Sequence, residues 1–220
     1  MKMIDLSYPM VPNMLGKDKG PHQNMELTTH RTIDKDGMQT MSIRFGNHVG
    51  THLDGPAHVV KGARTIAELP LDTFYGTGVV LDVPKGADEV MTIDDLKKAS
   101  PAISRGDIVI IHTGWGDRLD HPDYFQHHPY MANDCALWLV EQKIKMIGAD
   151  LLSPDLPWSL KKEGFRFTTL RTFLENEIPV LLQMTNLGSL VGRRVFIMAL
   201  PIAFQGSDSA PARAVAMVDE

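Results

Sequence analysis

Three histidines and one aspartate lie within residues 48–58, which read HVGTHLDGPAH. Imidazole nitrogens and carboxylate oxygens are common ligands of divalent ions such as zinc and manganese. The four residues, His48, His52, Asp54 and His58, all occupy even-numbered positions. Alternate side chains of an extended chain point to one face. The spacing therefore predicts one face on which these side chains lie together and bind a metal ion.

The backbone of this stretch must bend if its side chains are to reach one ion. In a straight strand His48 and His52 would lie roughly 13 Å apart, since each residue adds about 3.3 Å. Two imidazoles that each bind an ion at about 2.1 Å do not comfortably span that distance. Gly50 lies between them and permits a bend. Gly50, Gly55 and Pro56 also exclude a helix.

The donor set is typical of a catalytic site, because three protein ligands leave a coordination position open. His48, His52 and Asp54 supply three ligands. An ion bound there would lower the pKa of a bound water from about 16 towards about 7. His58 follows the Gly55–Pro56 turn and is then free to accept or donate a proton. As an alternative, Asp54 holds the tautomer of a ligating imidazole.

Composition indicates an ordinary globular protein and excludes several classes. The 220 residues are 43% hydrophobic and 22% charged, with a formal net charge of −5, which fits a single domain over residues 1–220. No run of Lys and Arg exceeds two residues, so no nucleic-acid or membrane partner is expected. Cys135 is the one cysteine and cannot form an internal disulfide. The N-terminus lacks the apolar segment of a secretory signal, so a cytoplasmic location is expected.

The elements that must position the motif alternate between strands and helices. The runs GVVLDV and DIVIIH are almost wholly apolar, which is typical of strands covered on both faces. One helix is expected to begin at Thr92, which forms a capping-box pattern with Asp95, and to be stopped by Pro101. A second is expected to begin with Asn133 as its cap, and a third covers residues 167–176. We expect an α/β domain with a mixed sheet rather than a barrel. The expected strands cover residues 3–7, 26–32, 40–45, 78–83, 107–112, 145–148, 178–184, 194–200 and 213–218.

HVGTHLDGPAH resembles the HxGTHxDxPxH signature of the cyclase family of metal-dependent hydrolases, which includes kynurenine formamidase and isatin hydrolase. The resemblance covers most of the chain, since DLSYPM, DIVIIHTGW, IGADLLSPD, IPVLLQMTNL and SAPARAVAM also resemble family segments. It implies a swivelling β/β/α-type domain, assembled as a homodimer or homotetramer, with manganese or zinc as cofactor. By position it implies that His48, His52 and Asp54 are metal ligands and that His58 is the acid/base.

The chain departs from the kynurenine formamidase branch at its metal ligands. In that branch a late Glu bridges two ions and an earlier His binds the second ion. Here Gln183 occupies the late position, Arg171 and Thr172 stand where that His is expected, and no His follows His128. A neutral amide adds no charge to offset the repulsion between two cations. We therefore expect one divalent ion, Mn²⁺ or Zn²⁺, bound by Gln183 together with the three motif ligands.

A second departure lies in the N-terminal loop, where the formamidase branch places a Trp against its aryl substrate. Residues 12–23 contain no Trp, Tyr or Phe, so Met14 and Leu15 are expected to contact the substrate instead. His112 ends the strand DIVIIH and is a further candidate, because strand ends often border active sites. Both departures favour a relative of isatin hydrolase, which opens a cyclic amide.

The sequence thus predicts a metal-dependent hydrolase that acts on a small amide, cyclic amide or lactone. One alternative is a kynurenine formamidase (arylformamidase) with two metals. Another is a non-catalytic metal-dependent protein that binds small molecules, although His58 speaks against it because a binding protein needs no base there. No GxSxG elbow and no phosphate-binding glycine loop occurs, so neither a serine nucleophile nor a nucleotide site is expected.

Overall fold

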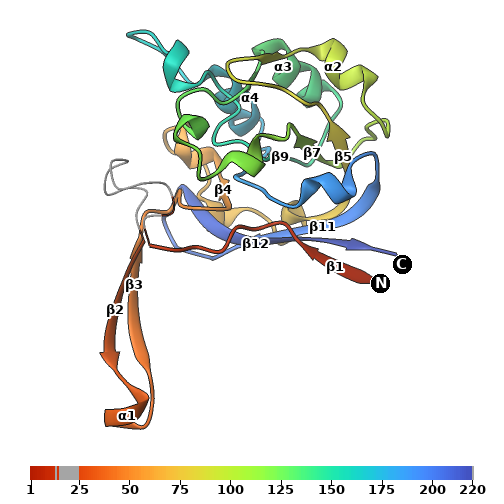
Figure 1. The fold of residues 1–220 in the computed structure, drawn as a ribbon. Helices are drawn as coiled ribbons and strands as arrows, with labels where there is room; N and C mark the ends of the chain where they lie inside the picture. The colour runs from red at the N-terminus through yellow and green to blue at the C-terminus, as the bar shows by residue number, and fades with distance from the viewer. Residues whose placement is uncertain (13, 15–24, 220) are drawn as a thin grey trace.

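Four parallel strands form the centre of the fold. The computed structural model describes residues 1–12, 14 and 25–219. Within the main sheet, β5, β7, β9 and β10 run parallel to one another (Figure 1). Their β-branched apolar side chains are buried on both faces, as the sequence predicts. The four strands span Tyr75–Asp82, Ile108–His112, Met146–Ala149 and Val180–Leu182.

A short strand closes this sheet into a barrel. β4 (His52–Asp54) pairs antiparallel with β10 on one edge and with β12 (Ser209–Val218) on the other. β12 in turn pairs with β11 (Arg194–Pro201), and β11 pairs with β5. The mixed α/β sheet is confirmed, but the expectation that the domain is not a barrel was wrong. β4 has only three residues, too few to give the alternating pattern by which strands are recognised.

The remaining strands either extend this sheet or pair in twos. β1 (Lys2–Asp5) adds to the outer edge of β12, and β6 (Val90–Met91) pairs with β8 (Tyr130–Met131). All nine predicted strands are present within a few residues of their expected bounds. The strands that the sequence did not indicate are β4, β6 and β8, each of two or three residues.

Three helices cover the outer face of the parallel strands (Figure 1). α2 (Ile93–Lys98) begins with the predicted capping box, because Thr92 and Asp95 bond reciprocally. α3 (Asn133–Glu141) begins one residue earlier than expected: Ala132 is the N-cap, and Asn133 is the first helical residue. α4 spans Thr168–Glu175. No helix in the described part of the chain is long and apolar enough to cross a membrane.

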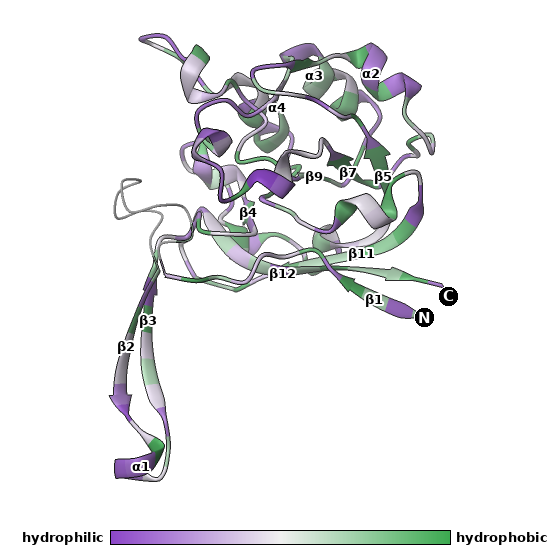
Figure 2. Cartoon of the chain, viewed as in Figure 1, coloured by the Kyte–Doolittle hydropathy of each residue, from purple (hydrophilic) through white to green (hydrophobic). Residues whose placement is uncertain are grey.

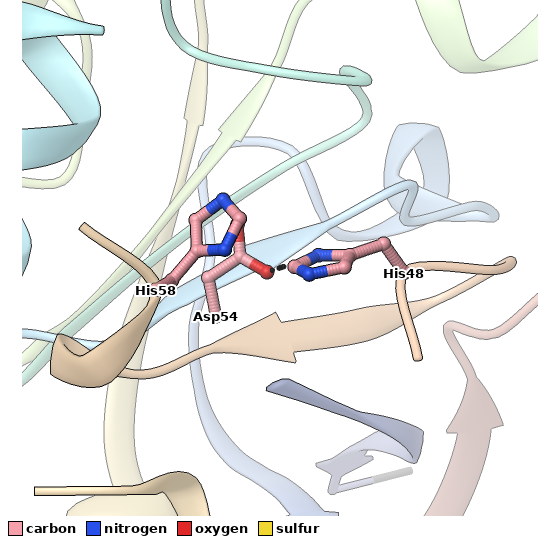
Figure 3. Close-up of side chains that lie close together, drawn as sticks. All are labelled: His48, Asp54 and His58. Carbon is pink, nitrogen blue, oxygen red and sulfur yellow. Dashed lines mark ion pairs between the residues drawn. The ribbon is translucent and has the colours of Figure 1, made fainter. Parts of the chain in front are cut away.

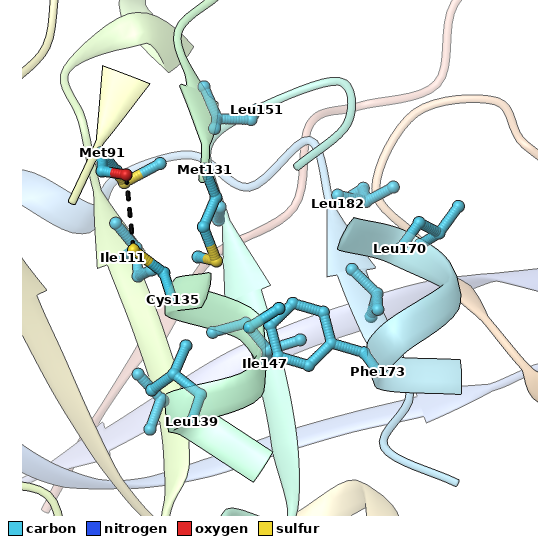
Figure 4. Close-up of a cluster of buried hydrophobic side chains, with 14 of the residues drawn as sticks. Met91, Ile111, Met131, Cys135, Leu139, Ile147, Leu151, Leu170, Phe173 and Leu182 are labelled. Carbon is cyan, nitrogen blue, oxygen red and sulfur yellow. Dashed lines mark hydrogen bonds between the residues drawn. The ribbon is translucent and has the colours of Figure 1, made fainter. Parts of the chain in front are cut away.

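The alternation of side chains along each strand divides the core in two. Val109 and Ile111 belong to the core on the helix side. Figure 4 shows Ile111 there together with Leu139 and Phe173. Ile110 faces the other side and packs inside the barrel. Leu53, at the middle of β4, also lies inside the barrel. Its neighbours His52 and Asp54 must therefore point outwards, towards the helix-covered side.

A hairpin extends away from this body. β2 (Met25–Arg31) pairs with β3 (Thr40–Phe45), and the short helix α1 (Ile33–Asp36) joins them (Figure 1). Apolar and polar residues are mixed along it (Figure 2). Leu27 lies opposite Ile43 in the register, and both side chains are exposed. We call residues 25–45 the arm.

Candidate metal centre

The pairing of β4 fixes two of the predicted ligands on one face. Leu182 of β10 lies opposite His52, and Val180 lies opposite Asp54. Because directly opposed residues share a face of a sheet, His52 and Asp54 lie on the same side as these two apolar residues. Both His52 and Asp54 are 2% exposed. The parity argument from the sequence predicts this arrangement.

Gly50 makes the bend that the sequence analysis requires. Its φ angle is +65°, in the left-handed region that glycine adopts at little cost. A side chain there would also meet Met10 and Met14 at 3.3 to 3.5 Å. The bend turns the Gly50 carbonyl towards His52, whose Nδ1 donates a hydrogen bond to it at 2.7 Å. His48, before the bend, is thereby returned to the face that holds Asp54.

Two imidazoles converge on one carboxylate oxygen. Nδ1 of His48 lies 2.9 Å from Oδ1 of Asp54, and Nε2 of His52 lies 3.5 Å from the same atom. Figure 3 shows His48 and His58 on either side of the Asp54 carboxylate. One donor atom each from His48, Asp54 and His58 lies within 4.8 Å of the others. The structure therefore brings all four motif residues together.

Asp208 is a functional candidate that the sequence analysis missed. Its Oδ2 lies 3.0 Å from Nε2 of His48 and 2.6 Å from Nδ1 of His58. Asn47 donates a hydrogen bond to the other oxygen, Oδ1. Asp208 immediately precedes β12, and its carbonyl accepts a hydrogen bond from Gly55. Asp208 lies 160 residues from His48 in the sequence, and closure of the barrel brings it to the motif.

The charges in this cluster shift the pKa values of its members. Burial alone would lower the pKa of His48, but hydrogen bonds to Asp208 and Asp54 outweigh it and raise this pKa to about 9. Hydrogen bonds from His48 and His58 hold the pKa of Asp208 far below its usual value. Burial lowers the pKa of His52. Burial opposes the charge on Asp54, but the hydrogen bond from His48 and the other neighbouring imidazoles outweigh it, so the pKa of Asp54 is also lowered.

Gln183 is buried beside the motif in a strained conformation. It is 0% exposed, and its φ angle is +54°, which is rare for a residue other than glycine. Its backbone N–H donates to the Leu151 carbonyl, and its own carbonyl accepts a hydrogen bond from Thr51 at 2.6 Å. Neither polar atom of the side-chain amide has a hydrogen-bond partner among the described residues. Buried amides are seldom left unpaired, so a ligand for this group is expected, although Gln183 is not among the residues that line the cavity at the motif.

A cavity of about 220 Å³ opens onto the motif. Besides His48, His52, Asp54 and His58, its wall contains the buried His128 and the half-exposed Lys161. Trp158 and Phe167, at 55% and 41% exposure, form part of its rim. The loop between β9 and α4 supplies Trp158, Lys161 and Phe167. The strand and helix patterns gave no signal for them, because that loop has no periodic pattern.

Two of the residues predicted to contact substrate, Met14 and His112, lie away from the motif cavity. Met14 is buried and lines a different cavity, with Tyr8, Val11 and Thr185. His112 ends β7 as expected, but its Nδ1 pairs with Asp82 at 2.8 Å and it borders a third cavity. Leu15 lies outside the described residues. Contact between these three residues and a substrate stays a prediction.

The donor set fits a divalent ion. His48 and His52 each turn one ring nitrogen to Asp54 and use the other to donate to an outer acceptor, Asp208 or the Gly50 carbonyl. Ligating histidines in metalloproteins are held by such outer hydrogen bonds. Asp54 Oδ1 is buried with two imidazole nitrogens turned towards it, and the Gln183 amide is buried without a hydrogen-bond partner among the described residues. His48, His52 and Asp54 would hold the ion, and the free amide makes Gln183 a candidate fourth ligand.

The chain is similar in sequence and in fold to several known proteins. A family model named Cyclase matches residues 4–156. The kynurenine formamidase of Salinibacter ruber is 28% identical over 219 residues, covering 98% of this chain and 97% of its own. A solved structure described as a potential metal-dependent hydrolase with cyclase activity superposes with a TM-score of 0.80 at 26% identity, covering 100% and 98% of the two chains. Isatin hydrolase A from Ralstonia solanacearum shares the fold, with a TM-score of 0.85, 22% identity, and coverage of 99% and 92%.

Proposed function

The chain belongs to the cyclase family, and from this premise we propose that it is a metal-dependent hydrolase. Its proposed substrates are small amides, cyclic amides such as isatin, or lactones. The observation that carries the proposal is the convergence of His48 and His52 on Asp54 Oδ1, each ring held from behind by an acceptor. Imidazole and carboxylate donors that converge in this way, with the rings oriented by outer hydrogen bonds, are typical of a site for a divalent ion.

His58 is the proposed acid/base. An ionised carboxylate only accepts hydrogen bonds, so the contact with Asp208 at 2.6 Å fixes the proton on Nδ1 of His58. In the neutral tautomer that this contact favours, Nε2 carries no proton and can take one from water. A divalent ion held by the motif supplies Lewis acidity to the carbonyl and lowers the pKa of water. The protonated His58 then donates to the leaving nitrogen or oxygen, and Asp208 stabilises its charge throughout.

One ion per chain is proposed rather than two. At the positions where the dinuclear branch has a second-ion histidine, Arg171 pairs with Glu175, and Thr172 bonds to Asn133 and the Thr168 carbonyl. Neither group is a histidine or a carboxylate. Gln183 would give one neutral oxygen, which suits one ion better than two. Two metal equivalents per chain would favour a kynurenine-type formamidase instead.

A turnover screen tests the proposal. Isatin, N-formylkynurenine and a dienelactone are offered to protein purified without chelators, with Mn²⁺ and Zn²⁺ added separately. Metal-dependent hydrolysis of at least one of them is the expected result. Tight binding with no turnover across the panel would favour the non-catalytic alternative. Hydrolysis that persists undiminished after complete removal of metal would exclude the mechanism.

We also propose that the chain assembles as a homodimer or homotetramer through the arm. An isolated two-stranded ribbon is marginally stable in water. Leu27, Met41 and Ile43 of the arm are each more than 40% exposed. A second copy that covers these side chains would account for their exposure on one chain. Light scattering measures the molar mass of wild type and of the Ile43→Lys variant. Because a charge buried at this contact would be unfavourable, the mass of the variant should shift towards that of the monomer.

A further inference from the structure

Lys161 presents an ammonium group that forms no ion pair with an acidic side chain in the described part of the chain. Its Nζ lies over three aromatic rings, 3.9 Å from the centre of Trp158, 4.6 Å from Phe167 and 5.2 Å from Phe165. Within the described part of the chain it forms no ion pair, and its side chain makes no hydrogen bond. The aromatic rings hold the charge in place by cation–π attraction. The ammonium is therefore oriented but keeps its hydrogen-bond donors free.

The same ammonium shares a cavity with the metal centre. Lys161 lines the wall that also contains His48, His58 and the buried His128. That cavity is about 220 Å³, which admits a small ring compound rather than a polymer. Trp158 and Phe167 give it apolar surface at the rim. A molecule whose reacting carbonyl lies at the motif would thus have its ring near these aromatics and a cation close by.

Burial makes an anion beside Lys161 favourable. Removal of the side chain from water lowers the pKa of Lys161, and Asp155 only partly opposes this. The Asp155 carboxylate is itself committed to the backbone N–H groups of Thr169 and Leu170. A bound carboxylate would restore favourable interactions to a cation that has lost part of its hydration.

We propose that Lys161 binds a carboxylate of the substrate, so that this hydrolase acts on carboxylated small aryl or ring compounds. The inference rests on the proposed function, because it assigns the substrate class of the same site. Lys161 acts here as a specificity residue: it binds the part of the substrate that does not react. The motif is taken up by the reacting carbonyl, so a carboxylate elsewhere on the substrate would be bound by the loop that supplies Lys161.

The affinities of the purified protein for benzoate and benzamide, measured by calorimetry, test whether the Lys161 ammonium group binds a carboxylate. Lys161→Met removes the charge and keeps the apolar stem, while Lys161→Arg retains the charge. Lys161→Met should weaken benzoate binding about 10-fold and leave benzamide unchanged, since a charge-assisted hydrogen bond is lost. Lys161→Arg should retain most of the benzoate affinity. The matched control is Lys162→Met, which removes an exposed charge on the next residue and should change neither affinity.

Equal losses for benzoate and benzamide, or no loss for either, would overturn the assignment of Lys161. Kinetic measurements then test the role of Lys161 separately from the proposed hydrolase function. N-formylanthranilate and formanilide differ by one carboxylate, and Lys161→Met should raise KM about 10-fold for the first substrate only. If the protein hydrolyses neither substrate nor the wider panel, the proposed function fails while the binding comparison still decides whether Lys161 is a carboxylate site. If KM rises equally for both, the function stands and the Lys161 proposal fails.

Discussion

Nδ1 of His58 lies 2.6 Å from Oδ2 of Asp208, although 150 positions separate the two residues in the sequence. The same oxygen lies 3.0 Å from Nε2 of His48. Asp208 thus connects a proposed metal ligand to the proposed acid/base. A single carboxylate orients both rings, so its charge should matter for metal binding and for proton transfer together.

Asp208→Asn should lower both metal affinity and kcat by about 10- to 100-fold, because outer hydrogen bonds of this kind contribute on that scale. The amide keeps the size of the side chain but carries no charge, and its NH2 group cannot accept the hydrogen bond that Asn47 donates to Oδ1. Metal content by mass spectrometry and kcat on the best substrate measure the two effects. Asp94→Asn, which neutralises an exposed acid on α2, is the matched control. Unchanged kcat and metal content in Asp208→Asn would remove Asp208 from the site.

Asp54→Ala should abolish both metal content and turnover. Both imidazoles converge on Oδ1 of Asp54, and replacement of this residue removes the one charged ligand of the proposed set from a buried site. His52→Ala should have the same effect. The variants are compared with wild type for bound metal after dialysis and for hydrolysis with added Mn²⁺ or Zn²⁺. Full turnover in a variant that retains no metal would contradict the assignment.

Metal affinity should rise with pH. In the metal-free protein the pKa of His48 is about 9, so at pH 7 its imidazole carries a proton that must leave when the ring binds an ion. Below that pKa, each unit of pH should therefore raise the apparent affinity by about tenfold. Calorimetry at pH 7 in two buffers with different ionisation enthalpies should report about one proton released per ion. An affinity that stays constant between pH 6 and pH 8 would show that His48 is not a ligand.

The sequence predicts the parts of this site that depend on local geometry. The parity of His48, His52, Asp54 and His58 predicts their shared face, and Gly50 predicts the bend, because both follow from one short stretch of backbone. Asp208 could not be predicted in this way. It reaches the motif only because β12 pairs with β4, and no local pattern encodes a contact between residues so far apart.

The same distinction applies to the fold. Strands such as β7 have long apolar runs and were predicted, whereas β4 is three residues long and its pairing closes the barrel. Lys161 lies in a loop without periodicity, and its role depends on aromatic neighbours at 158, 165 and 167. Which of several lysines lies in a cavity is decided by loop conformation, so composition and spacing do not reveal it.

Stability should fall below neutral pH because of His128. Burial lowers the pKa of His128 to about 4, and its Nδ1 donates to the Pro129 carbonyl at 2.9 Å. The unfolded chain takes up a proton near pH 6.5, before the folded protein does, so stability is lost as pH falls from about 6.5 to about 4. The contribution of His128 to this loss between pH 7 and pH 5 should be about 2 kcal/mol.

Urea unfolding at the two pH values measures this loss. His128→Gln should reduce the difference in the free energy of unfolding between pH 7 and pH 5, since the glutamine does not titrate. His121→Gln is the control, because the side chain of His121 is 47% exposed. An identical pH dependence in wild type and His128→Gln would show that another group causes the acid sensitivity.

Gln183→Glu tests whether the buried amide faces the ion. In the metal-free protein the new carboxyl group would have no partner, because the amide atoms that it replaces have none. A buried charge without a partner costs several kcal/mol, so the metal-free variant should unfold at a markedly lower temperature. A divalent ion beside the carboxylate would offset that cost. Saturating Zn²⁺ should therefore raise the Tm of Gln183→Glu more than that of wild type. Gln126→Glu, at an exposed position, should gain from Zn²⁺ only as much as wild type does. If Zn²⁺ stabilises all three proteins equally, Gln183 lies too far from the ion to bind it, and the motif must hold the metal with three protein ligands alone.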